Sequence, residues 1–322
     1  MNKHPRIVFI VLVVSLLITM YFAFTTGKLS ASWDQVMTKI TTGHEPRVDA
    51  IIDLRMPRII IALFVGAALA VSGALLQAVL QNPLAEANII GVTSGALLTR
   101  SLILLFIPTW YFYAPLMSFI GGIIPFLILL WLFKRYHMSP VRIILVGVAM
   151  YAMLNGVLAL VQINPLVKLP TGLSLKVWKD VYIIVTFSVI GIVASTLFIK
   201  QTNLLSFEEK QANNIGFHMT RYRMIIGLIA VFLASSATAI VGEMAFVGLI
   251  VPHIVRRLVG SNYKNVIPNA IVLGALVVLN ADTLGRTIVQ SHEIPANVLT
   301  VILGGPFLIY LICKGAYRHA GK

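Results

Sequence analysis

Charged residues and cysteine are what this sequence has least of. Asp, Glu, Lys and Arg make up only 11% of its 322 residues, whereas a soluble domain has roughly 25%. So few charges cannot cover a water-exposed surface, and this excludes a soluble protein. The single cysteine, Cys313, has no partner for an intrachain disulfide or for a cysteine-based metal site.

The signatures of common enzymes are also missing. The sequence has no G-x-x-x-x-G-K-[ST] phosphate loop, no H-E-x-x-H zinc motif and no G-x-S-x-G nucleophile elbow. His253, like His137 and His292, lacks a second histidine or a carboxylate at metal-ligand spacing. We therefore expect no catalytic residue, no metal site and no permanently bound cofactor.

Long uncharged stretches are what the sequence has instead, in a chain that is 58% hydrophobic. They cover residues 7–27, 59–85, 101–133, 143–167, 181–199, 224–242, 265–281 and 294–313. About 20 apolar residues cross a bilayer as a helix, so these stretches predict an all-α, polytopic membrane protein. The apolar run after the basic residues 1–6 is too long for a signal peptide, and we expect an uncleaved first span.

Ten spans are predicted, some of them short or broken by Gly and Pro. They are 7–26, 57–80, 90–107, 116–133, 142–162, 181–199, 222–241, 244–258, 266–286 and 295–313. The rest of the chain, shared among the termini and nine loops, leaves no segment near the ~50 residues of an independent soluble domain. A single transmembrane domain over residues 1–322 is therefore expected, and any chemistry that requires a soluble nucleotide-binding domain would belong to a separate chain.

The distribution of positive charge predicts the orientation. With alternating spans and the N-terminus inside, 15 of the 25 Lys and Arg residues lie on the cytoplasmic side. Both termini are therefore expected in the cytoplasm. The net charge of +14 reflects basic residues at the ends of spans in contact with lipid, and we expect no nucleic-acid partner.

Two arginines one helical turn apart, Arg55 and Arg58, lie at the predicted outer end of the second span. Pro57 suits the first turn of a helix, so we expect the helix to begin there. Arginines often anchor a helix at the membrane interface. Because Arg forms bidentate pairs with carboxylates, this pair could instead be presented to an external acidic partner.

Asp282 and Arg286 are four residues apart in the ninth predicted span, which places them on one face of a helix. The simplest interpretation is an internal ion pair. Charges within membranes usually face the bundle or a pathway, so a role for Arg286 at the outer mouth is the alternative.

A polar segment at 201–221 lies on the predicted cytoplasmic side. It contains Glu208, Glu209 and Asn214 and then Gly216, a pattern that predicts a short helix ended by a glycine. Such a segment is either a solvated loop or a docking helix for a cytoplasmic partner.

Taken together, the motifs resemble the permease subunits of bacterial ABC importers for iron-siderophores, haem and vitamin B12. The matching strings are 54–58 (LRMPR), 71–77 (VSGALLQ), 81–85 (QNPLA), Gly91, 246–253 (FVGLIVPH), 281–282 (AD), Arg286, 293–295 (EIP) and 304–306 (GGP). They occur in order over nearly the whole chain, and the sequences of these motifs resemble those of haem permeases most.

The resemblance implies a permease subunit in the bacterial cytoplasmic membrane. It implies a second permease subunit, a homodimer being allowed, a cytoplasmic ATPase dimer that uses ATP, and an extracytoplasmic binding lipoprotein. The transported ligand would be haem, with a ferric siderophore or, less readily, vitamin B12 as the alternative.

The resemblance also assigns roles to residues. Arg55, Arg58 and Arg286 would pair with acidic residues of the binding protein. Segment 201–221, with Glu208, Glu209, Asn214 and Gly216, would hold the helix that couples the permease to the ATPase.

The pathway would be lined by spans five and ten and by the broken region after span seven, with Asn155 and Gly156 as candidates. The sequence departs from the family pattern at Ala87, at 262–264 and at Asn297, which could alter helix bending near the pathway or a cytoplasmic contact.

Two other classes of protein remain open on the residues alone. A membrane enzyme of lipid or prenyl chemistry would need polar metal-binding clusters, which the sequence lacks. A channel or ion-coupled carrier would need no ATPase, so copurification of an ATPase distinguishes it from an importer.

Overall fold

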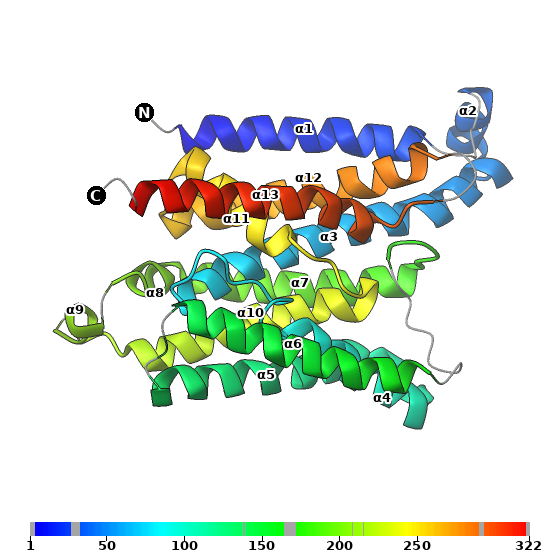
Figure 1. The fold of residues 1–322 in the computed structure, drawn as a ribbon. Coiled ribbons are helices and arrows are strands. Elements are labelled where there is room, and N and C mark those ends of the chain that lie inside the picture. Colours follow the sequence, from blue (N-terminus) through cyan, green and yellow to red (C-terminus); the bar gives the residue numbers. More distant parts are fainter. Residues whose placement is uncertain are drawn as a thin grey trace.

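The computed structural model describes residues 4–26, 33–136, 138, 140–163, 172–207, 209–214, 216–289 and 293–319. Every regular element within these residues is a helix, and the long helices lie side by side (Figure 1). They are α1 (Pro5–Thr25), α2 (Trp33–Thr42), α3 (Pro46–Val79), α4 (Val92–Phe106), the 3-10 helix η1 (Pro108–Tyr113), α5 (Ala114–Tyr136), α6 (Pro140–Gln162), α7 (Trp178–Leu197), α8 (Ile199–Leu204), α9 (Glu209–Asn214), α10 (Met219–Val241), α11 (Val247–Val259), α12 (Tyr263–Thr287) and α13 (Ala296–His319).

Each of the ten predicted spans corresponds to one of these helices. Over the described residues, seven of them are long and apolar enough to cross a bilayer, namely α1, α3, α5, α6, α7, α10 and α12. α4 has 15 residues and α11 has 13, in agreement with the prediction that some spans are short.

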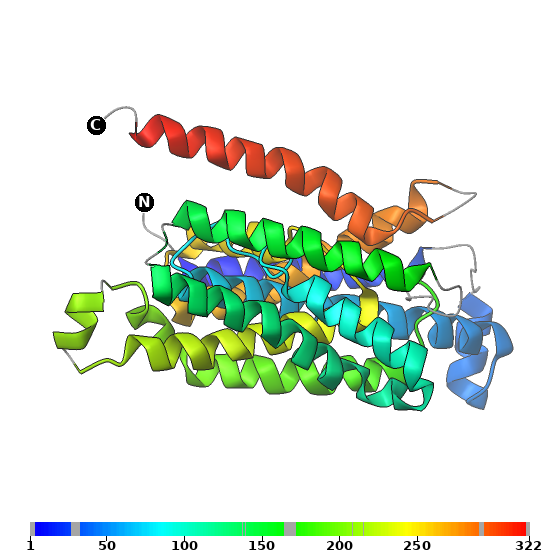
Figure 2. The same ribbon diagram turned by 60° about the horizontal axis from the view of Figure 1, so that its bottom comes forward.

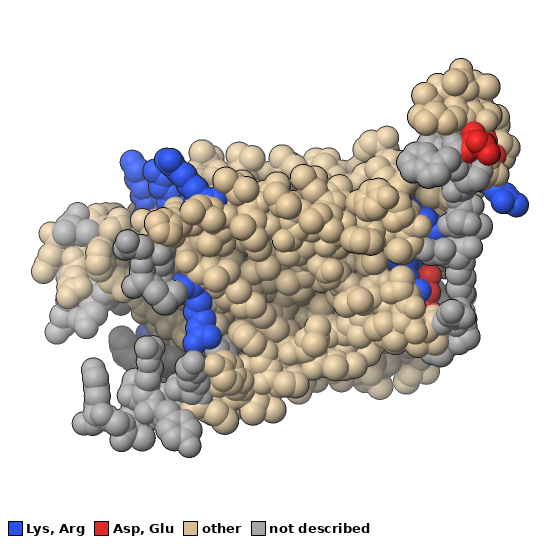
Figure 3. All heavy atoms as spheres, turned by 90° about the horizontal axis from the view of Figure 1, so that it is seen from above, with Lys and Arg blue, Asp and Glu red and all other residues tan. Residues whose placement is uncertain are grey.

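One face of the bundle shows a clear separation of charged and uncharged side chains. In the face shown in Figure 3, Lys, Arg, Asp and Glu of the described residues gather at the ends, and uncharged residues form the band between them. The N- and C-terminal ends of the chain lie at the same end as α9, and α2 lies at the opposite end (Figure 1). This arrangement suits a bundle that crosses the membrane an even number of times.

The start of α3 differs from the sequence prediction. Glu45 caps this helix by accepting a hydrogen bond from the backbone N–H of Val48 at 2.7 Å, and Pro46 occupies the first turn. Pro57 therefore lies inside the helix, and the prediction that it begins the second span is wrong. The extra turns carry α3 beyond the apolar segment, so Arg55 and Arg58 lie on a regular helix and not at its first turn.

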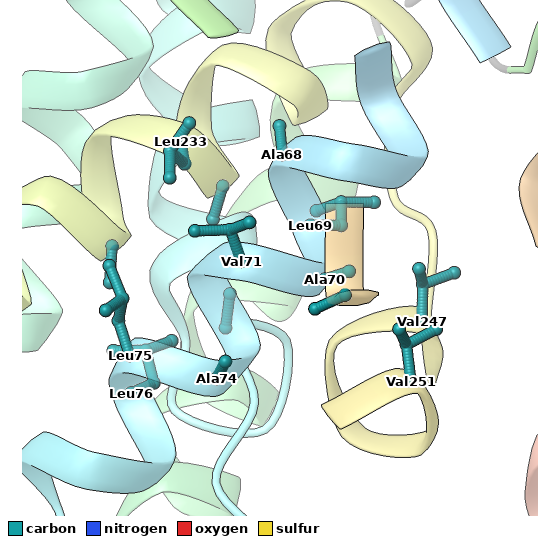
Figure 4. Close-up of a cluster of buried hydrophobic side chains, with 14 of the residues drawn as sticks. Ala68, Leu69, Ala70, Val71, Ala74, Leu75, Leu76, Leu233, Val247 and Val251 are labelled. Atoms are coloured by element: carbon teal, nitrogen blue, oxygen red, sulfur yellow. The ribbon is translucent and has the colours of Figure 1, made fainter. Parts of the chain in front are cut away.

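α3 is the centre of the bundle and packs against α12, α10, α7 and α11. Every residue from Val65 to Val79 is buried. Figure 4 shows α3 side chains between Leu233 of α10 and Val247 and Val251 of α11. Because lipid supplies no hydrophobic driving force between helices, association depends on close packing, and the Gly, Ala and Ser residues of α3 permit it.

Two glycine pairs mark close helix crossings. A Cβ atom added at Gly66 would lie 2.2 Å from the carbonyl oxygen of Gly274 in α12. A Cβ atom added at Gly73 would lie 1.9 Å from the carbonyl oxygen of Gly248 in α11. Both neighbours are backbone atoms, so no side-chain rearrangement could make room.

Two non-helical stretches lie within the bundle. Segment 80–91 turns back from the end of α3 and approaches α6, where the carbonyl oxygen of Ile89 would lie 2.8 Å from a Cβ added at Gly147 (Figure 1). Segment 242–246 joins α10 to α11 and ends at Phe246, whose φ of 69° is left-handed. Irregular backbone at this depth is tolerated where protein surrounds it or where it lines a cavity.

α13 is the helix least embedded in the bundle. It packs on α12 and α11 and stands apart from the other helices in the view of Figure 2. Large apolar side chains on it, including Ile302, Leu303 and Ile309, are exposed in the single chain. The space between α13 and the bundle contains the cavity described below.

Candidate functional site

An ion-pair cluster ties together the ends of α3, α12 and the connection to α13. The guanidinium of Arg58 donates from Nε to both carboxylate oxygens of Asp282, at 2.9 and 3.0 Å, and its Nη2 lies 2.8 Å from Oδ1. Its Nη1 donates to Oε2 of Glu293 at 2.7 Å. Arg58 is therefore shared between a buried carboxylate and an exposed one.

The other two candidate arginines join the same cluster. Arg286 Nε lies 3.4 Å from Asp282 Oδ2, and Arg286 Nη2 donates to the carbonyl oxygen of Ala23 at the end of α1. Arg55 Nη1 donates to the neighbouring carbonyl oxygen of Phe24 at 2.6 Å. The internal ion pair predicted from the spacing of Asp282 and Arg286 is thus present. The structure brings Arg55, Arg58 and Arg286 together and keeps their side chains mostly buried.

Glu293 is the accessible member of the cluster. Its side chain is 41% exposed, against 1% for Asp282, and it also accepts a hydrogen bond from Ser174 at 3.1 Å. Burial raises the pKa of Glu293, but the hydrogen bond and charge of Arg58 outweigh burial and hold the pKa below its ordinary value. A lowered pKa means that the ion pair contributes above the unfolded-state pKa and is lost as the pH falls through the folded-state pKa.

A cavity of about 540 Å³ lies between α6, α13 and the two non-helical stretches. It is lined by Glu86, Asn88, Ile89, Val148, Tyr151, Glu243, Ala245, Phe246, Asn297, Val301 and Leu308. α6 and α13 are the fifth and tenth predicted spans, and 242–246 belongs to the broken region after the seventh. The elements expected to line a pathway therefore surround one cavity.

The polar groups of this cavity make two sets of contacts, one around Tyr151 and one around Glu86. Tyr151, at the middle of α6, donates its hydroxyl to Oε1 of Glu243 at 3.1 Å and lies near the Asn155 side chain. The Glu86 side chain lies against the backbone at the start of α11, where its Cγ would be 3.4 Å from a Cβ added at Gly248. Glu86 thus faces the first turn of α11, and Glu243 faces the hydroxyl of Tyr151.

The two candidate pathway residues lie in different surroundings. Asn155 contacts Tyr151 and so lies next to the cavity lining. Gly156 is exposed on α6, and a Cβ added there would have nothing within 4 Å. Sequence reasoning missed Glu86, Tyr151 and Glu243, although carboxylates within an otherwise apolar region were a usable signal.

The segment proposed to couple to an ATPase lies at the end of the bundle that holds the chain termini (Figure 1). α9 begins at Glu209 and ends at Asn214, and Gly216 has a left-handed φ of 73°, as predicted for a helix-ending glycine. Glu208 lies outside the described residues. Gln81 of the α3–α4 connection donates to the carbonyl oxygens of Leu205 and Phe207, which links segment 80–91 to the chain that leads into α9.

Known proteins resemble this chain along nearly its whole length. The model of the FecCD transport family matches residues 12–314. The proteins named "Probable heme-iron transport system permease protein IsdF" of Staphylococcus aureus strains MSSA476 and Newman are each 55% identical to it over 313 residues, which is 97% of this chain and 97% of each relative.

Solved structures share the fold. A metal-chelate type ABC transporter in an inward-facing conformation has a TM-score of 0.80 at 27% identity, covering 97% of this chain and 100% of that one. PsaBC from Streptococcus pneumoniae, in complex with Fab, has a TM-score of 0.54 at 19% identity over 79% of this chain and 89% of that one, a likeness of fold alone. The predicted all-α, multi-pass permease fold is confirmed. The chain belongs to the FecCD transport family.

Proposed function

We propose that this chain is the permease subunit of an ATP-driven importer that moves haem iron across the bacterial cytoplasmic membrane. The observation that carries the proposal is the 55% identity to proteins named as haem-iron permeases, over 97% of both chains. A ferric siderophore is the alternative cargo, because a cavity with largely apolar walls could pass either ligand.

The assembly we propose contains two copies of this chain, two cytoplasmic ATPase subunits and an external binding lipoprotein. Residues 1–322 form a single transmembrane domain, so ATP hydrolysis belongs to the partner chains. Both termini and α9 face the cytoplasm, in line with the excess of Lys and Arg at that end. Segment 201–221, with Glu208, Glu209, Asn214 and Gly216, contains the helix that contacts the ATPase.

Growth on defined iron sources tests this function. A strain that lacks this chain is expected to lose growth on haem as sole iron source and to keep growth on ferric siderophores, and the restored gene should reverse the loss. Loss on a siderophore alone would keep the permease and overturn the cargo. Unchanged growth on both, or failure of any ATPase to copurify with the tagged chain, would overturn the importer.

For docking of the binding protein we propose the arginine cluster of Arg55, Arg58 and Arg286 at the opposite end of the bundle. The accessible carboxylate of Glu293 is paired with Nη1 of Arg58. An acidic residue of the binding protein would therefore have to displace Glu293 from this nitrogen. Glu293 then acts as an internal competitor for the docking site.

Removal of this competitor should strengthen docking. We expect Glu293→Gln to increase the affinity of the complex for its binding protein by up to fivefold, the value of an exposed ion pair worth about 1 kcal/mol. The affinity would be measured on the complete transporter in lipid nanodiscs, with the exposed Asp34→Asn of α2 as the matched control. Weaker binding of Glu293→Gln would contradict a docking role for Arg58.

A further inference from the structure

The cavity beside α6 has an unusual set of polar groups. Among the described residues that line it there is no Lys, Arg or His, and the ionisable groups are two carboxyls and one phenol. A site built to hold the carboxylates of a ligand would present arginine or lysine to them. The lining therefore suits the positive part of a ligand better than its negative part.

Tyr151 and Glu243 both line this cavity. The Tyr151 hydroxyl donates to Glu243 at 3.1 Å, and the Asn155 side chain lies near the same phenol. The pair thus fixes the phenol oxygen on the cavity wall. Tyr151 lies halfway along α6, the depth at which transporters with broken helices place their substrate sites.

The remaining polar atoms of the cavity differ in how well they are satisfied. Glu86 lies against the backbone of Gly248 at the start of α11. The side-chain nitrogen of Asn88, a residue only 6% exposed, and Oδ1 of Asn297 are buried without a hydrogen-bond partner in the part of the chain that the structure describes. Both atoms belong to residues that line the cavity, although buried polar atoms are normally satisfied.

We propose that Tyr151 and Glu243 form a transient oxygen-ligand site for the ferric centre of the cargo as it passes the membrane. The inference rests on the proposed function, because it assumes a cargo that carries chelated iron. Tyrosine oxygen is an established axial ligand of haem iron.

Tyr151 and Glu243 together account for the proton that the ligand exchange releases. The Tyr151 O–H bond breaks, its proton passes to the Glu243 carboxylate, and a bond forms between the phenolate oxygen and Fe(III) while the outgoing axial ligand leaves. The reverse exchange returns the proton to Tyr151 and releases the iron. No oxidation or reduction takes place.

The site fits iron that is already chelated and not a bare ion. No group of three or more His, Cys, Asp or Glu residues able to hold a metal ion occurs among the described residues. One phenolate with one carboxylate can fill only an axial position. Such weak, partial ligation is useful in a pathway, where binding must favour entry and still permit departure.

The test uses the complete transporter with its ATPase in nanodiscs and ferric protoporphyrin as the probe. Addition of the probe to the wild type should give the absorption and electron paramagnetic resonance signals of phenolate-ligated ferric haem. Tyr151→Phe should abolish them, and Glu243→Gln should weaken binding about tenfold or more, as expected when the partner of a metal ligand is removed. Tyr182→Phe, which removes an exposed phenol from α7, is the matched control.

Comparison with metal-free protoporphyrin separates ligation from packing. The wild type should prefer the ferric form, and Tyr151→Phe should lose this preference while it keeps its binding of the metal-free form. The control Tyr182→Phe should keep both the preference and the basal ATPase activity of the wild type. Equal spectra for Tyr151→Phe and the wild type would overturn the proposal. A wild type that supports siderophore uptake and no haem uptake would instead overturn the proposed cargo, whatever the spectra of the variant.

Discussion

Replacement of Asp282 by asparagine is expected to destabilise the folded protein more than any other single change in the arginine cluster. Asp282 is 1% exposed and is paired with both Arg58 and Arg286. The neutral amide would leave two largely buried guanidiniums without their shared carboxylate, and breaking a buried ion pair costs about 3–5 kcal/mol. Thermal unfolding of the purified transporter in detergent, together with the yield of folded chain, measures the effect.

Glu293→Gln provides the comparison for this prediction. It removes a carboxylate from the same guanidinium, but at a position that is 41% exposed, where an ion pair is worth about 1 kcal/mol or less. The unfolding temperature should therefore fall far less than in Asp282→Asn. Equal unfolding temperatures for Asp282→Asn and the wild type would show that the cluster does not stabilise the ends of α3 and α12.

The arginine cluster also shows which contacts can be predicted from local sequence patterns and which cannot. The pairing of Asp282 with Arg286 follows from their spacing of four on one helix, and the sequence analysis predicted it. The pairing of Arg58 with Asp282 joins residues 224 positions apart, and no local pattern encodes it. The family resemblance assigned one role to the three arginines, but it did not indicate that Arg58 forms an ion pair with Glu293.

The helices themselves were largely predictable, because the thickness of a bilayer requires long apolar runs and such runs are easily counted. The start of α3 was missed because only Pro57 was considered, whereas Pro46 suits a first helical turn equally well and Glu45, which caps the helix, is not a residue typical of that position. The cavity was predictable only in outline. Asn155 was singled out, but Tyr151, one turn away, was not. Tyr151 becomes a candidate only through its hydrogen bond to Glu243, which lies on another element.

Replacement of Gly73 by alanine is expected to separate α3 from α11 and to stop transport. The new Cβ would lie 1.9 Å from the carbonyl oxygen of Gly248 and 2.4 Å from its Cα, so the two helix backbones must move apart. Overpacking of a buried site typically costs about 1–3 kcal/mol, and backbone contacts of this kind belong at the upper end of that range. Thermal unfolding and ATP-dependent haem uptake measure the two effects.

Gly156→Ala is the control that separates the close contact at Gly73 from the general effect of replacing glycine by alanine in a helix. A Cβ at Gly156 meets nothing within 4 Å, and alanine is favoured over glycine inside a helix by about 0.5–1 kcal/mol, so Gly156→Ala should unfold at the wild-type temperature or above it. Gly248 also lies against Glu86, which lines the cavity, so displacement of α11 by Gly73→Ala would disturb the wall of the cavity together with the packing. Loss of uptake should therefore accompany loss of stability in Gly73→Ala, and equal stability of the two variants would show that the α3–α11 crossing is looser than the structure describes.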